Sequence, residues 1–338
     1  MAGTTITVSD PGLQPAPGDT VQSVQFTKED SRILLAAAGW DGCVQIWNCA
    51  SAASATLQTQ TRQAFPVFAV AWNGDHSQLC IGDAEGKVKA WDPMVNSIYT
   101  LGDRSAPIRA MEFCRHTRSL ISGSWDQTIC FWDQRQHGPS LELHTKGRVF
   151  GLALVYPMLA AIQSDKNVTV WDMRMMEEGK REGVAVTDTN FRHQMRSVAI
   201  SHDTKSLALG LIDGRIFIKK ITPRVLPLIE SDYVFKCHRS PDFSYGVNAL
   251  RFNPLHATIL HSGGSDGGLN TWDVEARQRV KGYKDLGAPV TALDVSADSS
   301  LLAYAVGLDW RSGQEALPCR LSLRDIRSEC TRTSSYIA

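Results

Sequence analysis

The chain is built from short runs in which apolar and polar residues alternate, and hardly any of it has the period of an amphipathic helix. Runs such as S-V-Q-F and S-L-I-S-G-S alternate every second residue, as side chains do along a β-strand. A further kind of run, such as G-C-V-Q-I-W, follows a small turn that contains an acidic residue. The pattern predicts an all-β protein of short strands joined by tight turns.

This turn and strand recur at regular intervals. In five places an acidic residue is followed six residues later by a tryptophan: Asp41 and Trp47, Glu85 and Trp91, Asp126 and Trp132, Asp165 and Trp171, Asp266 and Trp272. Two degenerate copies carry Asp213 with Lys219, and Asp309 with Arg324 after an inserted loop. The resulting period of roughly 40 to 50 residues is typical of a propeller blade with four strands.

Over essentially its whole length the chain therefore resembles the WD-repeat propellers. We expect residues 1–338 to form a single seven-bladed β-propeller domain, with each acid in the turn between the second and third strands of a blade. Because a ring of blades must be closed to leave no exposed sheet edge, we expect the alternating residues 5–8, T-I-T-V, to form the outer strand of the last blade.

Charge and composition narrow the class of function. The 35 basic and 35 acidic residues cancel, so no global field attracts nucleic acid or acidic lipid. The chain begins without a secretion signal and has no apolar run long enough to cross a membrane. No catalytic constellation, phosphate loop or zinc spacing occurs among its residues. We expect a protein of the nucleus or cytoplasm that is not an enzyme, has no cofactor or bound metal, and does not insert into membranes.

Three tryptophans remain once the repeat and the core are accounted for. Trp40, Trp125 and Trp310 each adjoin the acid of a turn between second and third strands. In a propeller these turns emerge on the same face as the loops that join successive blades, so the three rings should share one rim. They either cover the core and line the central channel, or form a binding surface, since exposed tryptophan is enriched at interface hot spots.

The stretch Y-V-F-K-C-H-R should be the outer strand of the fifth blade. Strand alternation places Cys237 and His238 on opposite faces, so we expect no catalytic dyad or shared metal there. Arg239 ends the strand near the same rim, where Arg215 follows the turn of the fifth blade. These arginines either capture carboxylates of a partner or form salt bridges with turn acids such as Asp213.

Several short sequence motifs narrow the resemblance to a small branch of WD-repeat proteins. G-S-W-D-Q-T, I-D-G-R, F-K-C-H-R and Y-G-V-N-A-L-R-F-N-P are similar to the RNA export factor family, which docks at the nuclear pore, and to its sister family of spindle-checkpoint propellers. L-D-W-R-S-G in the seventh blade and Y-P-M in the fourth favour the export factors. Both families grip a short acidic peptide, the GLEBS motif, across the top face of the propeller.

The resemblance implies a peptide-binding site and a partner. Two glutamates of the peptide would be held by Arg215 and Arg239, with Lys236 as a weaker candidate because of strand alternation. Along the same rim we expect further contacts from Trp310, Arg311, Trp40, Trp125 and Tyr245. The implied partner is a GLEBS-containing FG nucleoporin, with mRNA or mRNP components also expected, and the implied location is the nuclear envelope at the pore, the nucleus and also the cytoplasm. A checkpoint adaptor that binds kinetochore proteins, and direct binding of RNA, stay open as alternatives.

Overall fold

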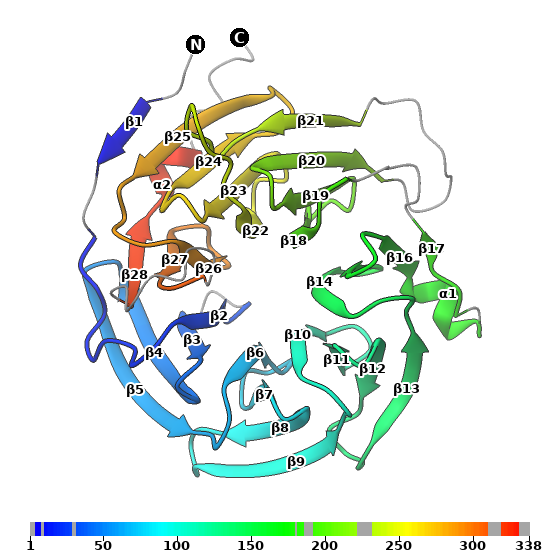
Figure 1. Ribbon diagram of the computed structural model, residues 1–338. Coiled ribbons are helices and arrows are strands. Elements are labelled where there is room, and N and C mark those ends of the chain that lie inside the picture. The colour runs from blue at the N-terminus through cyan, green and yellow to red at the C-terminus, as the bar shows by residue number, and fades with distance from the viewer. Residues whose placement is uncertain are drawn as a thin grey trace.

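The computed structural model describes residues 4–7, 10–28, 32–179, 181–185, 192–221, 232–309 and 319–330. Within these residues the strands form seven β-sheets, which stand around a centre as the blades of a propeller (Figure 1). Successive strands of each blade pair antiparallel in chain order, with the first strand innermost. The protein is thus the all-β, seven-bladed WD-repeat propeller that the repeat predicts.

The first four blades each contain four strands. Blade one consists of β2 (Val21–Phe26), β3 (Leu34–Gly39), β4 (Cys43–Ser51) and β5 (Ser54–Arg62). Blade two consists of β6 (Val67–Trp72), β7 (Leu79–Asp83), β8 (Lys87–Asp92) and β9 (Ser97–Asp103). Blade three consists of β10 (Ile108–Cys114), β11 (Ser119–Ser124), β12 (Thr128–Trp132) and β13 (Pro139–His144). Blade four consists of β14 (Val149–Val155), β15 (Met158–Gln163), β16 (Val168–Asp172) and β17 (Val184–Ala185), with helix α1 (Met173–Glu177) between the last two strands.

The remaining blades differ at their outer edges. Blade five consists of β18 (Met195–Ile200), β19 (Ser206–Leu211), β20 (Arg215–Lys220) and β21 (Tyr233–Lys236). Blade six consists of β22 (Val247–Phe252), β23 (Ile259–Gly264), β24 (Leu269–Asp273) and β25 (Gln278–Lys284), and carries β1 (Thr4–Thr7) on its outer edge. Blade seven consists of β26 (Val290–Val295), β27 (Leu301–Val306) and β28 (Arg320–Asp325), followed by helix α2 (Arg327–Cys330). Within the described parts of the chain, neither helix is long and apolar enough to cross a membrane.

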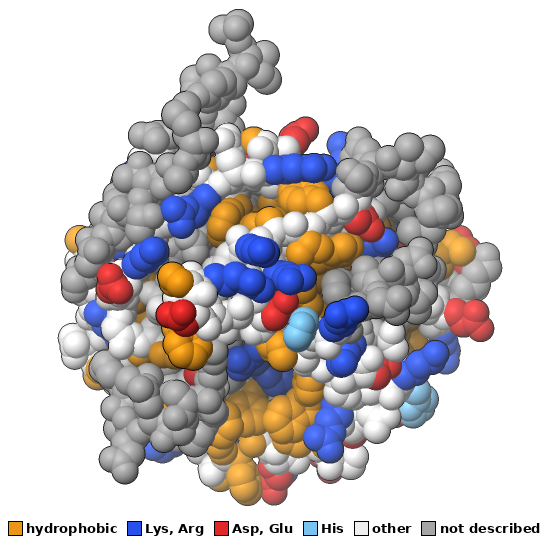
Figure 2. All heavy atoms as spheres, turned by 45° about the horizontal axis from the view of Figure 1, so that its top comes forward, with side chains coloured by type: hydrophobic (Ala, Val, Ile, Leu, Met, Phe, Trp, Pro, Cys, Tyr) orange, Lys and Arg blue, Asp and Glu red, His pale blue; other side chains and the backbone are white. Residues whose placement is uncertain are grey.

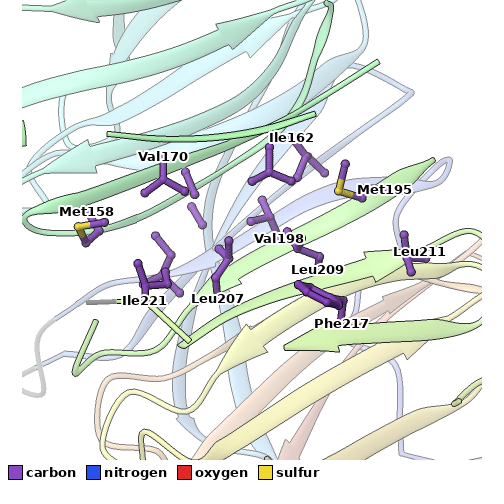
Figure 3. Packing of buried hydrophobic residues seen from close by; sticks show 14 residues of the cluster. Met158, Ile162, Val170, Met195, Val198, Leu207, Leu209, Leu211, Phe217 and Ile221 are labelled. Carbon is purple, nitrogen blue, oxygen red and sulfur yellow. The ribbon is translucent and has the colours of Figure 1, made fainter. Parts of the chain in front are cut away.

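The hydrophobic core lies between neighbouring blades. Between blades four and five, Ile162 and Val170 of one sheet face Val198, Leu209 and other apolar side chains of the next (Figure 3). Similar clusters occur between other pairs of blades, so each blade buries both faces of its sheet. This burial explains why the middle strands are almost continuously apolar, although their flanking strands alternate.

In several blades the repeated acid closes the turn between the second and third strands. A carboxylate oxygen of Asp126 accepts hydrogen bonds from the backbone N–H and the hydroxyl of Thr128. The carboxylates of Asp41 and Asp266 likewise accept from the N–H two residues further on. Aspartate favours such turns because its short side chain can bond to the backbone that follows it. In these blades the acid of the sequence motif therefore stabilises the turn.

The prediction that residues 5–8 form the outer strand of the last blade is wrong. Strand β1 pairs parallel with β25 of blade six, with Thr4 opposite Lys281 and Thr7 opposite Lys284, while residue 8 lies outside the described residues. The edge of β28 is occupied by residues 12–13 instead: Gly12 forms a bridge with Ser322, and Leu13 donates to a backbone carbonyl of β28 over 2.7 Å.

Proline explains why this contact stays short. Pro11 and Pro15 flank the bridging residues, and proline has no N–H to donate to a ladder.

Side-chain hydrogen bonds reinforce the contact, because Asp10 accepts from the Tyr304 hydroxyl, over 2.8 Å, and from Arg324. Arg324, which stands where other repeats have tryptophan, thus joins blade seven to the N-terminal segment.

Candidate functional site

Two arginines converge on the turn between the second and third strands of blade five. The Nε atom of Arg215, at the start of β20, lies 3.0 Å from Oδ2 of Asp213. Arg239 donates from its guanidinium to the backbone carbonyls of Asp213, over 2.7 Å, and Gly214, over 3.3 Å. One of its nitrogens is also 3.7 Å from Oδ2 of Asp213. The structure therefore brings the two arginines together, in the salt-bridged arrangement with a turn acid considered as an alternative above.

The turn itself requires glycine at position 214. Gly214 has a φ of +70°, a left-handed conformation that L-residues with a side chain rarely adopt. A Cβ atom at this position would also lie within 3.0 Å of the carbonyl oxygens of Cys237, His238 and Tyr245. The absence of a side chain lets the loop after β21 pack directly on the turn, and this packing places Arg239 beside Arg215.

A third basic side chain completes the group. Lys236 is directly opposite Arg215 in the antiparallel pair of β20 and β21, so both side chains project from the same face of the sheet. Lys236 is exposed, and the side chains of Arg215 and Arg239 are 44% and 27% exposed. We call Arg215, Lys236 and Arg239 the basic triad. Asp213 is the acid that pairs with the arginines of this triad among the described residues, so the local charge is positive.

The loop that carries Arg239 also presents an aromatic edge. Arg239 and Ser244 form a backbone bridge, and Tyr245 donates its N–H to the carbonyl of His238 over 3.0 Å. The ring of Phe243 lies 6.5 Å from that of Tyr245 and is 61% exposed. Phe243 was missed by the reasoning from sequence, although an exposed aromatic next to a predicted arginine clamp is a usable signal. The space-filling view shows basic side chains gathered with acidic, histidine and hydrophobic ones over one face of the protein (Figure 2).

Cys237 and His238 are structural, although strand alternation does not explain why. Strand β21 ends at Lys236, His238 has a φ of +40°, and both side chains are buried. The Nδ1 and Nε2 atoms of His238 lie 2.8 Å from Oδ1 of Asp266 and 2.9 Å from the Ser262 hydroxyl of blade six. Burial raises the pKa of the Cys237 thiol well above its ordinary value. Because the Cys237 thiol stays protonated and His238 bonds to residues of blade six, the two side chains do not form a nucleophile–base pair.

The two described rim tryptophans belong to a separate aromatic row. The rings of Trp40 and Phe68 have centroids 4.9 Å apart, and those of Phe68 and Trp125 are 6.2 Å apart. Trp125 meets Phe150 edge-on at 6.5 Å. This row spans blades one to four, whereas the basic triad lies on blade five. Trp310 and Arg311, predicted for the same rim, lie outside the described residues.

The described part of the chain holds no group of three or more histidine, cysteine or acidic side chains placed to bind a metal ion. The site therefore offers charge and apolar contact. Guanidinium groups form paired hydrogen bonds with carboxylates, and partly exposed arginines can exchange an internal partner for an external one.

Comparison with known proteins places the chain among others of this architecture. The family model of the WD domain, G-beta repeat, matches residues 14–48, 54–92, 95–133 and 230–273. The chain is 27% identical over 312 residues to Protein Rae1 of Drosophila melanogaster, covering 88% of each protein. It is 29% identical over 318 residues to mRNA export factor rae-1 of Caenorhabditis elegans, covering 89% of this chain and 83% of that protein. It is 27% identical over 316 residues to mRNA export factor GLE2 of Chaetomium thermophilum, covering 91% and 86% respectively.

Proposed function

The chain belongs to the WD-repeat family of mRNA export factors, and from this premise we propose that it is a non-enzymatic adaptor for mRNA export. In this role it docks an acidic GLEBS-type peptide of an FG nucleoporin on the face that carries the basic triad. Docking would hold the propeller at the nuclear pore, in the nuclear envelope, while other partners such as mRNP components engage the rest of its surface.

The observation that carries this proposal is the convergence of Arg215 and Arg239 on the turn of blade five. Both arginine side chains stay partly exposed although they contact Asp213. Two adjacent glutamates of a peptide could each be held by one arginine, while Lys236 adds a third positive charge. The exposed ring of Phe243 offers an apolar contact next to these charges. Charged groups flanked by an aromatic side chain are the composition expected of an interface hot spot.

A binding assay with an acidic nucleoporin peptide tests the proposal. Reversal of both charges, Arg215→Glu with Arg239→Glu, should weaken binding by ~2–5 kcal/mol because the glutamates of the peptide would face like charge. The matched control is Arg135→Glu, since Arg135 is also an exposed arginine paired with an aspartate, Asp133, over 2.6 Å. Unchanged affinity of the double variant, with the control also unchanged, would show that the peptide does not bind at the triad.

Localisation separates export from the spindle-checkpoint alternative. A fluorescent fusion of the full chain should stain the nuclear rim in interphase, and the double charge reversal should release it from the rim. Staining that is confined to kinetochores in mitosis would contradict an export role and favour the checkpoint adaptor. Direct binding of RNA is tested separately, because phosphate contacts would make affinity fall steeply with salt.

A further inference from the structure

The inner strands of all seven blades share one irregularity. Each strand skips one residue in its pairing with the second strand, between its first and third positions, which marks a β-bulge. The skipped residues are Gln22, Phe68, Arg109, Phe150, Arg196, Asn248 and Thr291. All seven line the same cavity in the central channel, because a bulge re-aims the side chain that it leaves out of the ladder. We call these residues the upper ring.

The upper ring contains two positive charges and no acid. Arg109 comes from blade three and Arg196 from blade five, and Phe150 of blade four stands between them in ring order. The acids of the channel lie in a lower layer, three residues further along their strands, at Glu112 and Asp294. Three residues of strand span roughly 10 Å, so the two layers are separate.

The acids of the lower layer have cations of their own. Arg251 lies 2.8 Å from Asp294 and 3.7 Å from Glu112, and Lys28 is 3.4 Å from Glu112. The negative charge in the channel is therefore matched by positive charge at the same level. None of these pairs involves Arg109.

Other members of the upper ring are held by the protein itself. The Thr291 hydroxyl donates to the backbone carbonyl of Val21 over 2.6 Å, and the Asn248 amide donates to that of Val290 over 2.9 Å. Gln22 accepts from the indole N–H of Trp40 over 3.4 Å. Across the part of the chain that the structure describes, Arg109 has no such hydrogen bond or ion pair, and it lies half-buried in the channel.

The charge of Arg109 is partly desolvated and has no counter-ion among the described residues. Desolvation in the channel, together with the positive charge of Arg196, lowers the pKa of its guanidinium to about 10. A charge that is partly removed from water and has no counter-ion lowers the stability of a fold, and arginine keeps its proton under ordinary conditions. The cavity around the ring has a volume of about 170 Å³, which is enough for a small polyatomic ion with some water.

We propose that the upper end of the central channel is an anion site in which Arg109, with Arg196 across Phe150, binds one compact oxyanion. The ligand is a phosphate or carboxylate group, because a guanidinium presents parallel N–H donors that match two oxygens of either group. The anion is either a free ion or a carboxylate of a bound peptide. The site is distinct from the basic triad. Binding of a free ion does not depend on the proposed function, whereas binding of a peptide carboxylate rests on it.

Titration of the full chain with inorganic phosphate at low ionic strength tests the site. Phosphate should bind saturably and raise the midpoint of thermal unfolding. Arg109→Gln should weaken its affinity by roughly tenfold or more, since one charge-assisted pair is lost. Arg109→Lys should retain part of the binding, and Arg135→Gln, an exposed arginine outside the channel, should retain all of it. Without phosphate, Arg109→Gln should unfold at the same or a higher temperature, because an unpaired charge has been removed.

A second titration distinguishes the sources of the anion. If phosphate does not bind but an acidic nucleoporin peptide binds roughly tenfold more weakly to Arg109→Gln than to the wild type, the ligand is a carboxylate of the peptide. If neither phosphate nor peptide affinity depends on Arg109, the anion site is overturned. The two sites can also fail separately. If charge reversal at the triad leaves peptide affinity unchanged, the proposed docking site is disproved. If phosphate still binds in a manner that depends on Arg109, the anion site stands.

Discussion

Blades five and six each have an aspartate in the turn between the second and third strands, but the two aspartates have different partners. In blade six, Asp266 contacts His238, His238 contacts Ser262, and Ser262 accepts the indole N–H of Trp272 over 2.8 Å. We call these four residues the closed network. In blade five, Asp213 faces the partly exposed Arg215 and Arg239, and its second oxygen, Oδ1, accepts no hydrogen bond from the described residues.

The difference follows from two substitutions at equivalent positions. Leu209 stands in blade five where blade six has Ser262, and Lys219 stands in place of Trp272. His193, in the loop before β18, is 49% exposed and lies 3.9 Å from Asp213, whereas the side chain of His238, in the loop before β22, is fully buried. Without the hydroxyl and the indole, the chain of hydrogen bonds cannot form, and the acid is left to the arginines. Blade five, which lacks this hydrogen-bond network, thus has partly exposed arginines at its turn.

The largest expected effect comes from breaking the closed network. His238→Ala should lower the free energy of unfolding by about 3 kcal/mol, because it opens a cavity and leaves the buried Ser262 hydroxyl and the partly exposed Asp266 carboxylate without this partner. Urea denaturation followed by tryptophan fluorescence measures the loss. His144→Ala is the matched control, since His144 is exposed and its contact with Glu142 spans 3.8 Å, and it should change stability by less than ~0.5 kcal/mol. Equal losses for the two variants would refute the structural role of His238.

A second buried histidine in blade six should make stability depend on pH. The Thr271 hydroxyl donates to Glu329, so it accepts from Nδ1–H of His261 over 3.1 Å, and Nε2 of His261 has no described partner. Burial lowers the pKa of His261 to about 4, whereas in the unfolded chain it is near its ordinary value of ~6.5. The unfolded state therefore takes up the proton first as pH falls, and the free energy of unfolding should drop by about 3 kcal/mol between pH 6.5 and 4.

The variant His261→Leu isolates this effect from other titrating groups. It removes the ionisable ring from an apolar site, so the difference in unfolding free energy between variant and wild type should change across that pH window. Denaturation curves at several pH values provide the measurement. A constant difference from pH 7 to pH 4 would mean that His261 does not titrate in this range.

The smallest expected effect sharpens the comparison at blade five. In Asp213→Asn the arginines lose an internal carboxylate that competes with a bound acidic peptide. Because the pair is partly exposed, we expect stability to fall by only about 1 kcal/mol or less and peptide affinity to rise by roughly three- to tenfold. Isothermal titration with the acidic peptide measures the change. Weaker binding would instead mean that Asp213 orients the arginines for their ligand.

Much of the fold, and the approach of two arginines to one turn, could be predicted from the sequence because both depend on residues that are close together in the chain. The spacing of acid and tryptophan follows from one turn and one strand, so it recurs unchanged in five of the seven copies of the repeat. The convergence of Arg215 and Arg239 could be predicted from their places at the turn and the strand end. Alternation extended through His238 places Lys236 and Arg239 on opposite faces, but the strand ends at Lys236, and Lys236 lies opposite Arg215.

Contacts between distant segments could not be predicted in the same way. The alternating pattern of β1 is compatible with any open sheet edge, and only the folded ring decides that it lies on β25 while residues 12–13 lie on β28. The closed network also joins a loop after blade five to two strands of blade six, and no local pattern marks that partnership.

By itself, the sequence determined the number of blades, the acid in each turn and the presence of arginines near one rim, because each depends on residues close together in the chain. Only the tertiary structure decided which arginines have a counter-ion. Closure of the ring brings Arg109 and Arg196 into one channel, and brings Arg251 between Asp294 and Glu112. The pKa of Arg109 is lowered and that of Arg251 is raised, mainly by Asp294, although both residues lie on inner strands, those of blades three and six. Charge and burial at a point depend on all the segments that meet there, and the order of residues along one segment does not contain that information.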